Sequence, residues 1–190
     1  MSTQRRWNAF DVNGLKGRIA EALVEGIFRR AGYVVSRTGR ESQVQRLIKI
    51  GSDEFLPDFL IRKEVRRDDA GRPLHRLLPL EVKYRHDVQA FLDRDGPEFF
   101  DRLSAQWPDL SVVFVTDHPA SGRSCFQIVE FSLGRTAGIQ DLHAVKDLEI
   151  YENTVREYEA LVRQIFPLVE RPEVGALNAM PVAQQVWRSY

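Results

Sequence analysis

An acid and a base stand two residues apart in an apolar stretch, at Glu81 and Lys83. The stretch runs from Leu77 to Arg85 and is typical of a β-strand. Because successive side chains of a strand point to opposite faces, the two charged groups are expected side by side on one face. The apolar side chains fall on the other face: Leu80, Val82 and Tyr84. Burying charges at mid-strand is costly unless they are paired or bind an ion, so a partner is expected elsewhere in the chain.

A second carboxylate, Asp58, opens the strand expected at residues 56–62. The turn-forming residues 68–73 predict a hairpin between this strand and the one that carries Glu81. Facing residues on adjacent antiparallel strands lie about 5 Å apart, so the two carboxylates are expected to meet. At that spacing they repel each other unless a cation lies between them. Oxygen ligands without Cys or His favour a hard ion, Mg²⁺ or Mn²⁺.

The chemistry that this set of residues supports is hydrolysis of a phosphodiester. A bound Mg²⁺ or Mn²⁺ lowers the pKa of its water and stabilises the charge that develops on phosphate. Lys83 beside the ion can orient or deprotonate the water, or neutralise the scissile phosphate. The sequence leaves the choice among these roles open.

A third carboxylate comes from the helix expected over residues 14–31. At about 100° per residue, Glu21 lies at the margin of the apolar stripe of this helix, whereas Glu25 lies about 40° further towards the polar side. Glu21 is therefore the one expected to reach inward. The stripe itself has helical spacing and consists of Leu15, Ile19, Ala20, Leu23, Val24, Ile27 and Phe28.

The pattern of segments predicts an α/β fold with a mixed sheet flanked by helices. We expect one domain over residues 1–190, with a core at about 14–132 and a C-terminal helix and tail at 150–190. Residues 43–49 fit either a short helix or a strand. The other expected elements are a basic arm over 1–12, a first helix capped by Asp11 or Asn13 and ended by Gly32, a strand at 33–36, helices over 87–106 interrupted at Gly96-Pro97, a buried strand at 110–116, a strand at 124–131, a helix at 152–166 and a loop-like tail from Pro167.

Composition narrows the class of protein. The 190 residues include 27 Lys plus Arg and 27 Asp plus Glu, so there is no global basic excess, although a neutral total can hide an acidic site ringed by arginine. The single cysteine, Cys125, excludes an internal disulfide and a Cys-rich zinc site and is expected in the core. The N-terminus does not resemble a signal peptide, and no apolar run has the length of a membrane span. We therefore expect a cytoplasmic protein without a membrane partner.

Pro57-Asp58 on one expected strand and Glu81-x-Lys83 on the next resemble the signature of the PD-(D/E)XK nuclease superfamily. The helix-first order, with Glu21 at the end of Gly-Arg-Ile-Ala-Glu, is similar to the archaeal Holliday-junction resolvase branch. This likeness covers about residues 14–116. It implies a three-layer restriction-endonuclease-like fold and Mg²⁺-dependent cleavage of DNA. By the same resemblance Asp58, Glu81 and Glu21 are catalytic metal ligands, and Lys83 is the catalytic lysine.

The match departs from the exonuclease branches of the superfamily. Those branches often carry a Gln-x-x-x-Tyr motif on the helix after the lysine strand, and the motif is missing from this sequence. No helix-turn-helix, zinc finger or basic helix is visible, so specificity is expected for DNA structure or ends, or to come from a partner. Because resolvases of the resembled type act as dimers, a homodimer is also expected, with the C-terminal helix or the apolar tail as its interface.

Other residues carry weaker expectations. Three arginines are candidates for DNA contacts: Arg85 shares the face of the charged pair, and Arg37 and Arg40 follow the first strand. His86 is expected to be a lone surface histidine, and His118 is expected to shape a loop.

Two alternatives stay open at this stage. The same fold can serve as a catalytically idle nucleic-acid-binding or scaffolding subunit, and divalent metal binding between Asp58 and Glu81 would discriminate against it. The chain can also be an enzyme of another class with its pocket elsewhere. Carboxylates that point apart would favour that interpretation.

Overall fold

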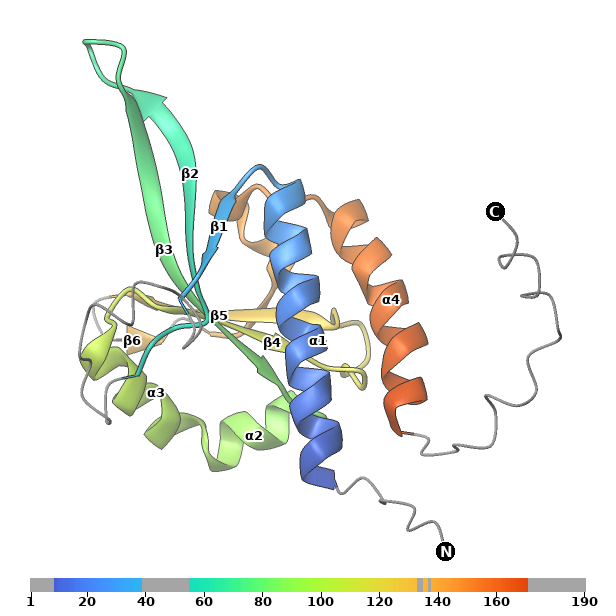
Figure 1. Cartoon of the computed structure of the whole chain (residues 1–190). Helices are drawn as coiled ribbons and strands as arrows, with labels where there is room; N and C mark the ends of the chain where they lie inside the picture. The colour runs from blue at the N-terminus through green and yellow to red at the C-terminus, as the bar shows by residue number, and fades with distance from the viewer. Residues whose placement is uncertain (1–8, 39–54, 133–134, 137, 171–190) are drawn as a thin grey trace, which may run out of the picture.

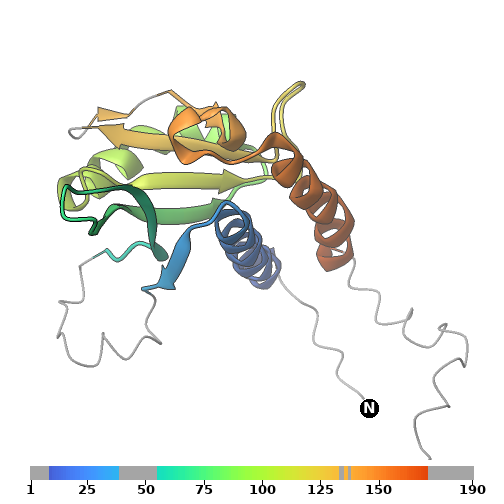
Figure 2. The ribbon, with the colours of Figure 1, turned by 90° about the horizontal axis from the view of Figure 1, so that it is seen from above.

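The computed structural model describes residues 9–38, 55–132, 135–136 and 138–170. In this part of the chain a β-sheet lies between two layers of helices (Figures 1 and 2). The α-helices and strands are, in chain order, α1 (Ala9–Arg30), β1 (Val34–Arg37), β2 (Phe59–Arg67), β3 (Pro73–Tyr84), α2 (Val88–Arg94), α3 (Gly96–Gln106), β4 (Ser111–Val115), β5 (Phe126–Ser132), β6 (Arg135–Thr136), β7 (Gln140–Asp141) and α4 (Glu152–Glu170). Two short 3₁₀ helices, η1 (Leu142–Ala144) and η2 (Lys146–Leu148), precede α4.

The seven-stranded sheet has the order β1-β2-β3-β4-β5-β6, and β7 pairs with β5. Strands β3 and β4 are parallel, and the other neighbouring pairs are antiparallel. Helices α2 and α3 form the connection that a parallel pair requires. The expected α/β class with a mixed, helix-flanked sheet is therefore confirmed. Within the described residues, no helix combines the length and the apolarity needed to cross a membrane.

Two apolar cores cover the two faces of the sheet. Helices α1 and α4 pack on one face, where Val24 and Val113 are buried. Helices α2 and α3 pack on the other face, where Phe91 and Phe114 are buried. Because β4 contributes to both cores, all its residues are buried, as its β-branched run predicts. Cys125 is buried as expected.

Helix α1 ends as predicted but begins earlier. The N–H groups of Gly32 and Tyr33 donate to the carbonyls of Arg29 and Phe28 at 3.1 and 3.0 Å, and Gly32 has a φ of +85°. This is the Schellman closure that favours glycine. The predicted cap at Asp11 or Asn13 is wrong, because the helix already starts at Ala9. These residues cost well under 1 kcal/mol each inside a helix, so they do not stop it.

Helix α4 is longer than predicted. It continues through Pro167 to Glu170, where a loop-like tail was expected. A proline inside a helix removes one main-chain hydrogen bond. Pro167 is exposed near the end of the helix, so water can hydrate the freed carbonyl, and Glu170 forms an ion pair with Lys16 of α1. This long-range pair is a tertiary contact that the local pattern did not contain.

The β2–β3 hairpin is also longer than expected, and Figure 1 shows it rising from the body of the sheet. The predicted turn is confirmed, with Asp68 N–H donating to the Arg72 carbonyl at 2.9 Å. Strand β2 begins at Phe59 instead of residue 56 and extends to Arg67. The outer half of β2 carries charged side chains, which are exposed. Main-chain hydrogen bonding to β3 continues as far as the pair Arg67 and Pro73, and this pairing does not require that either face of the hairpin be buried. Residues 43–49 lie outside the described residues.

A buried lysine joins the two helices of one layer to the ends of two strands. Lys16 of α1 is 1% exposed, and its Nζ donates to Asp117 Oδ2 at 2.6 Å and to the Tyr84 hydroxyl at 2.9 Å. It also pairs with Glu170. Burial alone would lower the pKa of Lys16, but these hydrogen bonds raise it above its ordinary value. The lysine is therefore charged inside the protein and depends on its partners.

We predict that Lys16→Met lowers the free energy of unfolding by about 3–5 kcal/mol, because it leaves Asp117 buried without its cation. Urea unfolding followed by circular dichroism measures the change. The control is Lys146→Met at an exposed position, for which a change below about 0.5 kcal/mol is expected. Equal stability of the two variants would show that the buried pair contributes nothing.

Candidate active site

Strand β3 changes its sheet neighbour at Leu80. Its pairing with β2 ends at Leu80, which faces Phe59, and its pairing with β4 begins at the same residue, which faces Ser111. Asp58 directly precedes β2, and Glu81 directly follows the point of exchange. The two acids therefore meet where one main-chain ladder stops and another starts.

Each of these carboxylates accepts a hydrogen bond from a main-chain N–H group on the chain segment that carries the other carboxylate. Asp58 N–H donates to Glu81 Oε2 at 3.0 Å, and Val82 N–H donates to Asp58 Oδ2 at 2.8 Å. The side chains thus extend the hydrogen bonding between β2 and β3 beyond the last paired residues. Asp58 and Glu81 therefore lie together, as the hairpin predicts.

Lys83 completes the set from the same face of β3. Its Nζ pairs with Glu81 Oε1. The Glu81 side chain is only 3% exposed, whereas Lys83 is half-buried. Burial raises the pKa of Glu81 to about 8, and the negative charge of Asp58 adds to the rise, while Lys83 opposes it. Lys83 therefore does not fully offset the cost of a charge at Glu81.

Glu21 approaches the other acids from helix α1. Burial raises the pKa of its carboxyl, and so does the nearby charge of Asp58, while Arg37 and Lys83 lower it. Asp58 and Lys83 of the candidate site therefore both act electrostatically on the Glu21 carboxyl. Its role as a metal ligand stays a prediction.

Glu25, the second glutamate of this helix, is more buried than predicted. Glu25 was expected to point further outward, yet its side chain is 17% exposed against 29% for Glu21. It accepts from Arg37 Nε at 2.9 Å and from Arg29 Nη2 at 2.8 Å. These ion pairs hold Glu25 against β1, and a helical wheel contains no information about such neighbours.

The candidate DNA contacts differ in their surroundings. Arg37 is exposed, pairs with Glu25 and lies over the Phe59 ring at 5.2 Å, beside the candidate site. Arg85 lies over the Phe91 ring at 4.3 Å and donates to the Tyr84 carbonyl, and its burial lowers its pKa. Arg85 is thus engaged in packing, and its contact with DNA stays a prediction. Arg40 lies outside the described residues.

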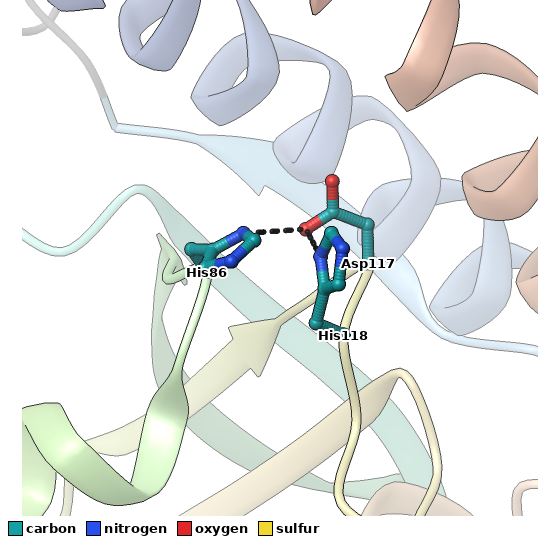
Figure 3. A group of neighbouring side chains, drawn as sticks. All are labelled: His86, Asp117 and His118. Carbon is teal, nitrogen blue, oxygen red and sulfur yellow. Dashed lines mark ion pairs between the residues drawn. The ribbon is translucent and has the colours of Figure 1, made fainter.

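A second polar cluster was missed by the sequence analysis. The rings of His86 and His118 lie 4.0 Å apart, and both face Asp117 (Figure 3). His86 is exposed as expected, but the expectation that it stands alone is wrong. The signal was present in the order of elements, because His86 follows β3 and Asp117-His118 follows β4. Residues that follow neighbouring parallel strands meet at one edge of a sheet.

Comparisons with protein-family models, with curated proteins and with solved structures find no match for this chain. The functional proposal therefore depends on the geometry of the site and on the resemblance of its motif.

We predict that the raised pKa of Glu81 makes stability fall with rising pH. Between about pH 4.5 and pH 8 the folded chain keeps a proton on Glu81 that the unfolded chain loses, so the free energy of unfolding decreases across this range. Glu81→Gln should remove roughly 3–5 kcal/mol of this decline. Urea unfolding at several pH values, with chelator present, measures the slope. Glu98→Gln, at an exposed position, should keep the wild-type slope, and the same slope in Glu81→Gln would contradict the prediction.

Proposed function

We propose that this chain is a metal-dependent nuclease of the PD-(D/E)XK type that hydrolyses phosphodiester bonds in DNA. The single observation that supports it most is the grouping of Asp58, Glu81 and Lys83 where β3 changes neighbours. Glu21 adds a carboxylate from α1. The order of helix, three antiparallel strands, helices and a parallel strand also supports a restriction-endonuclease-like fold, since it agrees with the helix-first order of the resemblance.

The residues of the site fit a hard divalent cation. Asp58, Glu81 and Glu21 would hold Mg²⁺ or Mn²⁺, because carboxylate oxygens are the ligands that these ions prefer. Burial raises the pKa of Glu81, and a cation beside the carboxyl would favour its ionised form, so metal binding at this site would release a proton. When bound, the ion supplies an acidified water and positive charge for the phosphate.

The protein residues prepare the site for a phosphate. Lys83 is held by Glu81 on one side and is partly accessible on the other, so its ammonium group can neutralise the scissile phosphate or orient the attacking water. The bond from Val82 N–H fixes the Asp58 carboxylate relative to β3. Arg37 provides an exposed positive charge beside the same acids and is proposed as a contact to the DNA backbone.

DNA is proposed over RNA because of the resemblance alone. The resemblance also underlies the proposed homodimer, for which the exposed Leu161 and Leu168 of α4 are candidate contacts. Specificity for DNA structure or ends fits a chain whose sequence shows no base-reading motif.

We predict that Lys83→Met and Glu81→Ala each lower the rate of DNA cleavage at least about 100-fold, because each removes charge needed in the transition state. Supercoiled, linear, single-stranded and four-way-junction DNA are incubated with Mg²⁺, Mn²⁺ or chelator. Circular dichroism confirms that the variants are folded, and Lys146→Met should cleave at the wild-type rate. A wild-type rate in Lys83→Met would disprove the proposed mechanism.

The alternative of a catalytically idle binding subunit has one observation in its favour. Both Asp58 and Glu81 already accept hydrogen bonds from the protein itself, so the pair is satisfied in part without an ion. Divalent metal binding therefore separates the two functions.

We predict that Mg²⁺ raises the melting temperature of the chain, because an ion that binds only the folded state stabilises it by about 2.7 kcal/mol at 100 times its Kd. Asp58→Asn keeps an acceptor for Val82 N–H but removes the charge, so it should abolish most of this effect. Asp69→Asn, in the exposed hairpin turn, is the matched control and should respond like the wild type. An equal Mg²⁺ response in Asp58→Asn would place the ion elsewhere, and DNA binding without any Mg²⁺ response would favour the idle subunit.

A further inference from the structure

We propose that His86, Asp117 and His118 form a second metal site, which binds a borderline divalent transition metal such as Zn²⁺. The three residues meet at the carboxyl ends of β3 and β4, and Figure 3 shows both imidazole rings turned towards one oxygen of Asp117. None of them belongs to the proposed nuclease site, and the proposal does not depend on nuclease activity.

The spacing of the donor atoms suits a tetrahedral ion. Asp117 Oδ1 lies 3.1 Å from His118 Nδ1 and 3.7 Å from His86 Nδ1. A tetrahedral ion with bonds of 2.0–2.2 Å spaces its ligands roughly 3.3–3.6 Å apart. All three ligand atoms lie within 4.8 Å of one another. The two distances from Asp117 Oδ1 are therefore within a few tenths of an ångström of the spacing that a tetrahedral ion sets.

Hydrogen bonding alone accounts poorly for this convergence. A carboxylate oxygen has two lone pairs, and Asp117 Oδ1 already accepts from the Tyr84 hydroxyl at 2.9 Å. A proton on His118 Nδ1, at 3.1 Å, can use the remaining lone pair, but His86 Nδ1, at 3.7 Å, is too far away for a hydrogen bond, so its approach to Asp117 has no such explanation. A metal ion that accepts a lone pair from one nitrogen of each imidazole and one from Asp117 Oδ1 would use all three ligand atoms at once.

The surroundings of Asp117 hold it in place for such an ion. Its other oxygen, Oδ2, accepts from Lys16 at 2.6 Å, and Tyr84 anchors Oδ1. Carboxylates that bind metals are oriented in this way by outer hydrogen bonds. Glu170 pairs with the same Lys16 and offsets its charge, so the negative charge of Asp117 remains available to a cation.

Thr116 fixes the two histidines relative to each other. Its hydroxyl donates to the His86 carbonyl at 2.8 Å and accepts from His118 N–H at 3.0 Å. The side chain is buried, so one hydroxyl links the loop after β3 to the loop after β4. Thr116 is therefore a positioning residue for the proposed site.

The donor set and its exposure define the class of ligand. Two imidazole nitrogens and one carboxylate oxygen favour Zn²⁺, Co²⁺, Ni²⁺ or Cu²⁺ over Mg²⁺. The histidines are 63% and 58% exposed and Asp117 is 5% exposed, so an ion can reach the site from solvent and bind against a buried anion. Three protein ligands leave a fourth position for water or another small ligand.

The test is titration of the chelator-treated full chain with Zn²⁺ by calorimetry, and with Co²⁺ as a spectroscopic probe of nitrogen coordination. We expect one Zn²⁺ site whose affinity falls at least about 100-fold in His86→Ala and in His118→Ala. Thr116→Val keeps all three ligands and should lower the affinity about 10-fold.

Two controls make the result specific. His75→Ala removes an exposed histidine of the β2–β3 hairpin and should bind Zn²⁺ like the wild type. Glu81→Gln should also keep the Zn²⁺ affinity while losing the Mg²⁺ response, so that failure of one proposal is distinguishable from failure of the other. Absence of Zn²⁺ binding, or unchanged binding in both His86→Ala and His118→Ala, would overturn the second site.

Discussion

The exchange of neighbours along β3 is the constraint on which the rest of this structure depends. Up to Leu80 the strand pairs with β2, and from Leu80 it pairs with β4. A strand that leaves its partner exposes main-chain N–H groups, and buried N–H groups need acceptors. Asp58 provides one for Val82, and Glu81 provides one for Asp58. The carboxylates of the candidate nuclease site therefore also accept main-chain N–H groups that the strand pairing leaves without a partner at the point of exchange.

The same exchange creates the second polar cluster. Because β3 and β4 run parallel, their carboxyl ends lie at one edge of the sheet, where the loops with His86 and Asp117 leave side by side. Lys16 ties this edge to α1 and α4 through Asp117 and Glu170. Hydrogen bonds from Lys16, His118 and Tyr84 outweigh burial and lower the pKa of Asp117 to about 2. Asp117 is thus a permanent anion at neutral pH, which both the buried lysine and a bound cation require.

Local patterns predicted the elements whose signals are complete within a short window. Gly32 ends α1 because the left-handed conformation favours glycine, and the β-branched run of β4 is buried on both faces. Period-2 alternation separated Glu81 and Lys83 from the apolar face of β3. Predictions failed where a distant contact overrode a local preference, as at Pro167, where the helix continues to Glu170. The pairing of Glu25 with Arg37 likewise comes from a neighbouring strand.

The sequence by itself determined the α/β class, the acids and lysine of the candidate nuclease site, and the hairpin that brings Asp58 to Glu81. These follow from alternation, turn chemistry and charge, which are properties of nearby residues. Only the tertiary structure decided the grouping of His86 with Asp117 and His118, because 30 residues separate the two loops and the parallel pairing of β3 with β4 brings them together. Tertiary structure also decided how far each acid is buried, and hence the raised pKa of Glu81, since burial depends on all the layers that pack around a side chain.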